Sequence, residues 1–402
     1  MVKPRIFINM TYMEVGGAER ALLGLLRALD TERVDVDLFL NQHTGEFMNF
    51  IPQSINLLPE NMVYSLIRKP IMEVIKNGKI KIAYLRMLSR YRYKRDVYRR
   101  GIEGCYNHYI MNSLIDHLPS LYCLGEYDLA LSFIDPSQII HEKILAKKRI
   151  EWLHTDFSVF NMDEKCMNRT WGLDDYIAAV SQDLAMRFKE KYPQFAEKVI
   201  VIENILSPET IRDESNSDIA IEMKNCGDRI KILSIGRICY AKNFERIPDI
   251  ASILKLKGVN FEWFIVGPGN ASDIMRHASE LCVDDLIHFI GKKDNPYPYI
   301  KSCDIYVQPS RREGKSVTVR EAQILCKPVI ITRYPTSGSQ IKDGIDGVIC
   351  DMDNDSVARS IIDLYHDKEK QNRIIDYLKS HDYGNKKEVE KIYKLIEGDK
   401  TR

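Results

Sequence analysis

The chain has 402 residues, of which 45% are hydrophobic, 9% aromatic and 29% charged, and its formal net charge is +1. This length and composition predict a soluble protein of two or three globular domains, and the balanced charge excludes a molecule that binds nucleic acid through its overall field. The nine cysteines are odd in number, scattered and never spaced as C-x-x-C. This pattern argues against a disulfide framework or a structural zinc site, and we expect buried thiols in a reducing compartment.

The first residues, MVKPRIFINM, are too short and too soon interrupted to form a signal peptide. No uninterrupted apolar run reaches the roughly 18 residues that a membrane span requires. We therefore expect a cytoplasmic protein.

Strand-like and helix-like segments alternate through the first half of the chain. Helical patterns follow the first and fifth strand candidates, at residues 18–30 and 182–192. Such alternation predicts parallel strands joined by crossover helices. The strand candidates are PRIFINM (4–10), VDVDLFL (34–40), YDLALSF (127–133), RIEWLH (149–154), YIAAVS (176–181) and KVIVIEN (198–204).

Within this half, residues 68–100 contain about a dozen Lys and Arg against Glu73 and Asp96, interleaved with Ile, Leu, Met and Tyr at helical spacing. Basic amphipathic helices of this kind bind anionic membrane surfaces. The alternative is a solvated insertion. We expect a basic helical insertion at 62–118 that meets a membrane surface, and no nucleic-acid partner, because no recognised module accompanies the basic run.

Residues 207–229 are polar and break the alternation, so they mark the domain boundary. The alternation then restarts, which predicts two successive α/β sheets whose ligands sit at the carboxyl ends of the strands. We expect a Rossmann-like domain at 1–206, a second one at 207–384, and a closing amphipathic helix at 385–402. The strand candidates after the boundary are KILSIGR (231–237), FEWFIVG (261–267), LIHFIG (286–291), DIYVQPS (304–310), PVIIT (328–332) and GVICD (347–351).

Three sets of residues lie at predicted strand ends. Gly16 and Gly17 follow the first strand and open a helix, where backbone N–H groups bind anions, although a tight turn explains them equally well. Arg237 and Lys242 follow the first strand of the second domain and suit a diphosphate; the alternative is a solvated edge. His154 ends another strand and is placed to donate a hydrogen bond to a sugar or phosphate oxygen, unless it is a structural histidine.

The stretch RREGKSVTVREAQILCKPVIIT (311–332) carries two glutamates separated by seven residues, Glu313 in a turn and Glu321 inside the next helix. The N–H groups of the turn and first helical positions have no intrahelical partner and bind hydroxyls or phosphate. A carboxylate accepts two hydroxyls, so sugar rings are natural partners for both glutamates. The alternatives are a loop acid at Glu313 and a surface charge at Glu321.

In chain order, GGAER, the histidine after a strand, GR-x4-KN, VGPG, FIG and PS-x2-EG-x6-EA-x4-KPVI-x-T resemble the family 4 glycosyltransferases, a retaining group with the GT-B fold of two Rossmann-like domains facing across a cleft. The resemblance covers nearly the whole second domain and, more thinly, the first strand, loop and helix and His154. The chain departs from the usual pattern at Lys315 and Ser316, which follow the EG, and at Lys327, where a glycine is usual.

The resemblance implies a role for each matched residue. Glu313 would bind the hydroxyls of the donor sugar, and Glu321 those of the ribose. Arg237 and Lys242 would neutralise the diphosphate leaving group. His154 would contact the sugar near its reacting carbon. The backbone or side-chain groups that complete the donor site would come from Gly16, Gly17, Lys293 in the base-lining segment 291–293, Gly314, Lys315, Ser316 and Val317.

We therefore expect a retaining, metal-independent glycosyltransferase that moves a hexose from a nucleotide diphosphate sugar, UDP-linked, to a glycan or lipid-linked acceptor of a surface polysaccharide. Neither a cofactor nor a metal is expected, because no D-x-D-type cluster occupies the expected loop and two cations already meet the leaving-group charge. Two alternatives stay open. A sugar-nucleotide epimerase shares the fold, and a catalytically silent GT-B subunit would only bind a glycan or another transferase.

Overall fold

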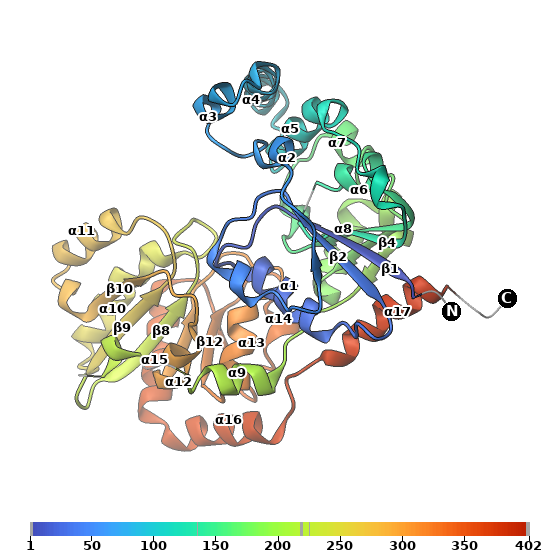
Figure 1. The fold of residues 1–402 in the computed structure, drawn as a ribbon. Coiled ribbons are helices and arrows are strands. Elements are labelled where there is room, and N and C mark those ends of the chain that lie inside the picture. Colours follow the sequence, from blue (N-terminus) through green and yellow to red (C-terminus); the bar gives the residue numbers. More distant parts are fainter. Residues whose placement is uncertain (1–2, 135, 218–219, 225, 399–402) are drawn as a thin grey trace. The chain divides into compact units, whose positions relative to one another are not determined.

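The computed structural model describes every residue except 1–2, 135, 218–219, 225 and 399–402 (Figure 1). The chain splits into two compact units. Unit 1 comprises Met1–Glu14, Ala18–Ile205 and Lys387–Arg402, and unit 2 comprises Val15–Gly17 and Leu206–Lys386. The predicted ranges 1–206 and 207–384 lie close to these units.

Unit 1 is built on a parallel sheet with the strand order β3-β2-β1-β4-β5-β6-β7. Its central strands are buried on both faces, as Ile6, Phe7 and Ile8 show, which explains why they read as continuous apolar runs. The six predicted strands of this half are confirmed. The strands are β1 (Arg5–Met10), β2 (Asp35–Leu40), β3 (Asn56–Leu57), β4 (Glu126–Ser132), β5 (Leu145–Leu153), β6 (Tyr176–Ala179) and β7 (Val199–Val201).

The helices of this part of the chain follow the predicted alternation. They are α1 (Gly17–Ala28), α2 (Met62–Ser65), α3 (Ile71–Lys76), α4 (Ile80–Arg100), α5 (Tyr106–Leu114), α6 (Gln138–Glu142), α7 (Glu164–Asn168), α8 (Gln182–Lys191) and α17 (Val389–Glu397), with 3-10 turns η1 (Glu46–Phe50), η2 (Ile115–His117), η3 (Tyr122–Leu124), η4 (Phe157–Val159) and η5 (Pro193–Lys198).

The predicted insertion at 62–118 is helical and consists of α2 to α5 and η2, which lie together in Figure 1. Its apolar residues pack against the sheet. Tyr64, Val74, Ile82 and Met111 belong to the same buried cluster as Phe7 of β1. The insertion is therefore anchored in the core of unit 1.

Unit 2 contains a second parallel sheet, with the order β10-β9-β8-β11-β12-β13. Its core includes Trp263 and Ile265 on one strand and Leu254 and Ile361 on flanking helices. All six predicted strands of this half are confirmed. They are β8 (Ile230–Ile235), β9 (Phe261–Val266), β10 (Ile287–Gly291), β11 (Ile305–Gln308), β12 (Val329–Thr332) and β13 (Val348–Cys350).

The remaining elements surround this sheet. They are α9 (Pro208–Glu214), α10 (Ile247–Leu256), α11 (Ser272–Glu280), α12 (Tyr297–Ser302), α13 (Val317–Ile324), α14 (Ser337–Gln340), α15 (Asn354–His366) and α16 (Lys368–Ser380), with 3-10 turns η6 (Ile221–Met223), η7 (Phe244–Arg246) and η8 (Asp284–Leu286), and η9 (Lys386–Glu388) at the return to unit 1.

The predicted closing helix is present as α17, drawn in red in Figure 1, and it belongs to unit 1. The hydroxyl of Tyr393 accepts a hydrogen bond of 2.7 Å from the backbone N–H of Asp30. Lys148 donates to the carbonyl of Leu395 at 2.6 Å. Local amphipathicity predicted this helix, and these contacts with unit 1 fix where it packs.

The structure adds elements that the sequence did not predict and corrects one expectation. The boundary segment 207–229 contains α9 and η6, and the two-residue strand β3 carries too little pattern to be predicted. The expectation of buried thiols holds for only part of the set: all nine cysteines are free, but Cys123, Cys239 and Cys282 are exposed. Cys282 lies in a turn and has a positive φ of 55°.

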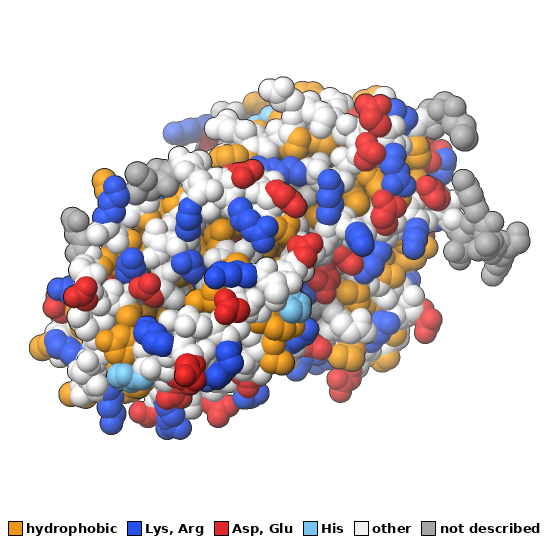
Figure 2. All heavy atoms as spheres, turned by 90° about the horizontal axis from the view of Figure 1, so that it is seen from below, with side chains coloured by type: hydrophobic (Ala, Val, Ile, Leu, Met, Phe, Trp, Pro, Cys, Tyr) orange, Lys and Arg blue, Asp and Glu red, His pale blue; other side chains and the backbone are white. Residues whose placement is uncertain are grey.

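On the face shown in Figure 2, basic and acidic side chains are interspersed with apolar ones, which agrees with the net charge of +1. Across the part of the chain that the structure describes, no helix is both long and apolar enough to cross a bilayer.

Candidate functional site

The strand order of unit 2 reverses between β8 and β11, and the loops after these two strands are joined. The amide of Asn243 donates to the Pro309 carbonyl at 2.9 Å, and the backbone N–H of Arg311 donates to the Ala241 carbonyl at 2.8 Å. In parallel α/β sheets, the crevice at such a reversal is where ligands bind. These bonds bring the predicted residue Lys242 next to the predicted residue Glu313.

Glu313 lies at the centre of a hydrogen-bond network. Its Oε1 accepts from Lys242 Nζ at 2.6 Å, Ser310 Oγ at 2.6 Å and Gln308 Nε2 at 3.3 Å. The pair is largely enclosed, since the side chains of Lys242 and Glu313 are 20% and 11% exposed. Oε2 accepts no hydrogen bond from the residues that the structure describes, so one carboxylate oxygen is fixed by protein donors and the other can accept a ligand hydroxyl.

Two glycines allow the backbone to close around Lys242. A Cβ on Gly236 would lie 3.0 Å from Lys242 Cε, and a Cβ on Gly267 would lie 2.0 Å from the Gly236 carbonyl oxygen. The glycines of the GR and VGPG motifs therefore allow the loops after β8 and β9 to approach each other closely. Any side chain at these two positions would clash with the other loop or with Lys242.

Arg237 is the second residue after β8 and is exposed. Among the residues that the structure describes, its guanidinium has no hydrogen bond or ion pair. Of the two cations predicted at this edge, Lys242 is paired with Glu313 and Arg237 is available to an anion. The alternative of a solvated edge applies to Arg237 only.

The turn after Glu313 is held by hydrogen bonds from residues further along the chain. Gln340 Oε1 accepts from the Ser316 N–H at 2.7 Å, and Gln340 Nε2 donates to the Ser316 carbonyl at 2.9 Å. Thr336 Oγ1 donates to the Glu313 carbonyl at 2.7 Å. Gly314, Ser316 and Val317 are buried and Lys315 is half-buried. Helix α13 begins at Val317 with no side-chain cap, so its first N–H groups remain available to an anion or hydroxyl.

Glu321 is the fifth residue of α13 and is fully buried. Its Oε1 accepts a hydrogen bond of 3.1 Å from the Tyr297 hydroxyl. The alternative that Glu321 is a surface charge is therefore wrong, because the helix turns this face towards the interior of unit 2.

Lys293 lies just after β10 and forms an ion pair of 2.8 Å with Glu222, which also accepts from Tyr299 at 2.8 Å. The hydrogen bond to Glu222 raises the pKa of Lys293. Its ammonium group is held by protein partners, so a ligand would meet a fixed charge here.

His154 directly follows β5 in unit 1 and packs against Phe133, with ring centroids 4.7 Å apart and the ring planes tilted by 46°. Burial lowers the pKa of its imidazole to about 3, which keeps the ring neutral. Its buried Nε2 has no hydrogen-bond partner, so this nitrogen is available to a ligand. Gly16 and Gly17 lie at the start of α1, as predicted from the sequence.

Sequence reasoning missed the residues that position the glutamates: Gln308, Ser310, Tyr297, Thr336 and Gln340. A signal existed for Gln308 alone, as a polar residue that ends an apolar strand. The other residues gain their roles only through packing.

Residues 218–381 match the family model described as glycosyl transferases group 1. The chain is 26% identical over 251 residues to an uncharacterized glycosyltransferase of Haemophilus influenzae, which covers 60% of this chain and 68% of that protein. It is also 26% identical over 162 residues to the N-acetylgalactosamine-N,N'-diacetylbacillosaminyl-diphospho-undecaprenol 4-alpha-N-acetylgalactosaminyltransferase of Campylobacter jejuni, covering 40% of this chain and 42% of the relative. The chain thus spans less than half of that second relative.

Among solved structures, the chain resembles HepE of Anabaena in complex with UDP and glucose, with a TM-score of 0.70, 13% identity, and coverage of 98% of this chain and 99% of that one. At this identity, the likeness concerns the fold. The two parallel α/β sheets and this likeness show a GT-B fold of two Rossmann-like domains, and the family match over the second unit, with the relatives, supports a glycosyltransferase.

Proposed function

We propose that the chain is a retaining, metal-independent glycosyltransferase that moves a hexose from a UDP-linked donor to a glycan or lipid-linked acceptor in surface polysaccharide synthesis. The observation that carries this proposal is the arrangement around Glu313. One oxygen of this carboxylate is fixed by Lys242, Ser310 and Gln308, and the other is available. Arg237 lies on the adjoining loop without a partner in the described residues.

The chemistry assigned to this site follows from its charges. The bond between the sugar C1 and the diphosphate oxygen breaks, and the leaving nucleoside diphosphate keeps the electron pair. Arg237 and Lys242 stabilise the negative charge that develops there, the task for which preorganised cations are most effective. The acceptor hydroxyl oxygen bonds to C1 on the same face, and its proton leaves with the phosphate. Glu313 Oε2 holds a sugar hydroxyl during this change.

The rest of the donor site is assigned by position. Glu321 binds the ribose hydroxyls, with Tyr297 fixing its carboxylate, and Lys293 lies beside the base. The N–H groups of Gly314, Lys315 and Val317 hold sugar and phosphate, whereas that of Ser316 donates to Gln340. Gly16 and Gly17 contribute backbone N–H groups to the diphosphate, and the neutral His154 of unit 1 contacts the sugar near C1.

The names of similar proteins support the choice of donor and acceptor. HepE was solved with UDP and glucose, and the Campylobacter jejuni relative is named for a substrate linked to diphospho-undecaprenol. A UDP-sugar donor and an acceptor carried on a lipid diphosphate are therefore the first pair to test.

We also propose that unit 1 rests on an anionic membrane surface through helix α4. Opposite its buried residues Ile82, Ser89 and Asp96, this helix exposes an apolar stripe. The stripe consists of Ile80, Tyr84, Met87, Tyr91 and Tyr98. The exposed basic residues Lys81, Arg92, Lys94 and Arg99 flank it. An apolar stripe between basic flanks matches a bilayer interface that has acidic headgroups, and a lipid-linked acceptor is found there.

A panel of UDP- and GDP-linked sugars tests the proposal through release of UDP or GDP, with and without a lipid diphosphate-linked glycan. We expect slow release from one UDP-sugar, acceleration by the acceptor, and a product that keeps the anomeric configuration of the donor. An epimerase would instead convert the sugar, and a silent subunit would release nothing. No turnover of any donor in the presence of acceptor would contradict the enzyme assignment.

A further inference from the structure

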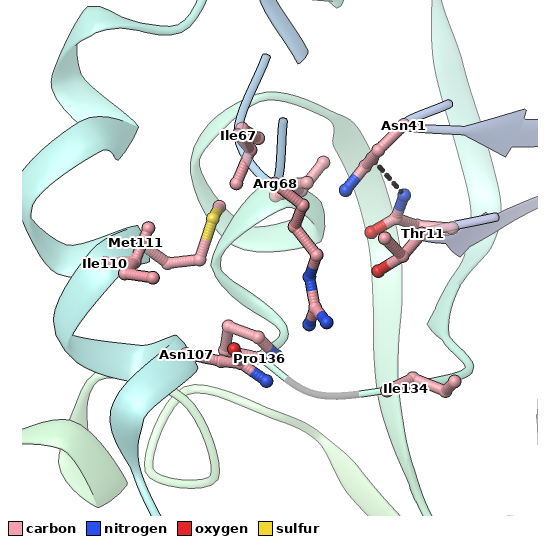
Figure 3. A pocket seen from close by; sticks show the side chains of 11 residues that line it. Thr11, Asn41, Ile67, Arg68, Asn107, Ile110, Met111, Ile134 and Pro136 are labelled. Atoms are coloured by element: carbon pink, nitrogen blue, oxygen red, sulfur yellow. Dashed lines mark hydrogen bonds between the residues drawn. The ribbon is translucent and has the colours of Figure 1, made fainter. Parts of the chain in front are cut away.

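A cavity of about 30 Å³ lies in unit 1 at the carboxyl ends of β1, β2 and β4 (Figure 3). The strand order of unit 1 reverses between β1 and β4, and the crevice at such a reversal is where parallel α/β sheets bind ligands. Loops of the helical insertion and helix α5 close its other side. The volume holds a small polar head of a few atoms, about the space of two water molecules, and excludes a sugar ring.

Two buried amide side chains direct a hydrogen-bond donor towards this cavity. Asn9 and Asn41 are only 4% and 7% exposed. Asn9 Nδ2 donates to Asn41 Oδ1 at 3.1 Å, and this bond fixes the Asn41 amide with its nitrogen facing the cavity (Figure 3). That nitrogen has no partner among the described residues, which is costly for a buried donor unless a ligand or water accepts from it.

Arg68 supplies the charge. Its guanidinium extends into the cavity in Figure 3, in the direction of Thr11 and Asn107, and has no ion pair with any described residue. The loop that carries it is held on both sides, because Arg86 Nη1 donates to the carbonyls of Leu66 at 2.9 Å and Lys69 at 2.6 Å. The guanidinium is therefore presented by a fixed loop.

The described lining offers donors and a positive charge but no carboxylate. Five N–H donors of Arg68, the Asn41 amide nitrogen, the Asn107 amide and the Thr11 hydroxyl suit the oxygens of a phosphate or carboxylate. We propose that this cavity binds an oxyanion of the acceptor. The inference rests on the proposed function, because the donor diphosphate is assigned to Arg237 and Lys242 in unit 2 and leaves the acceptor as the second ligand.

Calorimetry on the full chain tests this directly, with saturating UDP present to occupy the donor site. Two probes are titrated, inorganic pyrophosphate for the head of a lipid diphosphate and glucuronate for an acidic sugar. We expect one of them to bind wild type, and Arg68→Gln to weaken that binding at least about tenfold, as expected when hydrogen bonds to a charged group are lost. Binding of pyrophosphate assigns the oxyanion to a diphosphate, and binding of glucuronate assigns it to an acidic sugar.

Two further variants sharpen the result. Asn41→Asp keeps the acceptor for Asn9 but replaces the inward donor by a negative charge, so it should weaken binding by a similar or larger factor. Arg90→Gln removes an equal charge from the exposed surface of α4 and should leave binding unchanged. Failure of both probes to bind wild type, or equal weakening by Arg68→Gln and Arg90→Gln, would overturn the proposal.

The readout needs no catalysis, so the anion site and the enzyme assignment can fail separately. Arg68→Gln should keep wild-type hydrolysis of the donor in the absence of acceptor. Anion binding that depends on Arg68 in a protein that turns over no nucleotide sugar would leave the site in place and remove the transferase. Loss of donor hydrolysis in Arg68→Gln would show that Arg68 serves the donor, and the acceptor site would be wrong.

Discussion

The ligand crevices of the two units lie at equivalent points of their sheets, between β1 and β4 in unit 1 and between β8 and β11 in unit 2. In unit 2 the crevice contains a paired charge, Lys242 with Glu313, beside a second cation, Arg237, that has no partner among the described residues. In unit 1 it contains the Arg68 guanidinium and the Asn41 amide nitrogen, neither of which has a partner among the described residues. The same topology thus provides two crevices, and the side chains at the strand ends decide what each one binds.

This difference affects which ligand each crevice prefers. A cation already paired with a carboxylate gains less from an arriving phosphate than an unpaired one, because the phosphate must compete with the carboxylate. The unit 2 crevice therefore suits a ligand that offers both a diphosphate and hydroxyls, as a nucleotide sugar does. The unit 1 crevice suits a compact anion.

The largest effect should come from breaking the pair in unit 2. Lys242→Ala removes a cation from the leaving group and leaves Glu313 without its charge partner, so we expect turnover to fall about 10²–10³-fold, by analogy with the loss of one preorganised donor. Release of UDP measures this. Lys257→Ala, at an exposed position beyond α10, is the control. In the same assay, activity should survive EDTA; abolition by chelator and rescue by Mn²⁺ would refute the metal-free mechanism.

The two glutamates should separate the sugar from the nucleotide. Glu313→Ala should lower turnover about 10²-fold while affinity for free UDP changes little, because its free oxygen contacts only the sugar. Glu321→Ala should weaken UDP binding about tenfold, since the ribose is bound alike before and during the reaction.

Calorimetric UDP binding and donor turnover distinguish these outcomes, with the exposed Glu369→Ala as control. Because Glu321 is buried, Glu321→Gln serves as a second variant that keeps the side-chain volume. If Glu313→Ala weakened UDP binding as much as Glu321→Ala and kept turnover, the assigned roles would be wrong.

The histidines of the two units should also make folding stability depend on pH in opposite directions. The His154 pKa in the folded protein, about 3, lies below its unfolded value of about 6.5, so the unfolded state binds more protons in between. Its contribution to stability is complete above about pH 6.5 and is lost as the pH falls towards 3. Burial also lowers the pKa of His141 in unit 1, to about 4, in the same direction. In unit 2, a hydrogen bond to Asp249 raises the pKa of His277, so its contribution is present at low pH and is lost as the pH rises.

The buried His154 should therefore make unit 1 less stable as the pH falls below about 6. Urea unfolding at pH 7 and pH 4.5 measures this, and His154→Phe should show a smaller loss between the two than wild type. An equal loss in the variant would mean that the ring is not buried neutral in solution.

The smallest expected effect concerns the apolar stripe of α4. The protein should sediment with anionic liposomes and not with neutral ones, and salt should weaken the association. Arg92→Gln and Arg99→Gln should each reduce binding about fivefold, from about 1 kcal/mol per basic residue near the surface. Arg359→Gln with Arg373→Gln, exposed on unit 2 helices, is the matched control.

Equal binding to both kinds of liposome would remove the membrane surface from the proposal. If the stripe instead pairs two copies of the chain, the protein should sediment as a dimer without lipid and Tyr84→Ser should dissociate it.

The sequence alone was enough to predict most of the architecture, because its cues are local. Parallel strands buried on both faces read as apolar runs, and the helices between them have a regular apolar period, so twelve strands could be placed. Glu313 and Glu321 were found in the same way, since a strand, a turn and a helix follow one another within a short stretch. The basic run at 68–100 predicted helices, but not that α4 has one face in the core and an apolar stripe outside.

Tertiary structure decided which residues meet. Gln340 fixes Ser316 across 24 residues, Lys242 pairs with Glu313 across 71, and Asn9 orients Asn41 across 32. No local pattern encodes such contacts, because they depend on the order in which strands join the sheet and on loops packed against each other. Arg68 shows this most clearly. In the sequence it is one of about a dozen basic residues, and the structure places its guanidinium at the strand ends, on a loop that the bonds from Arg86 hold.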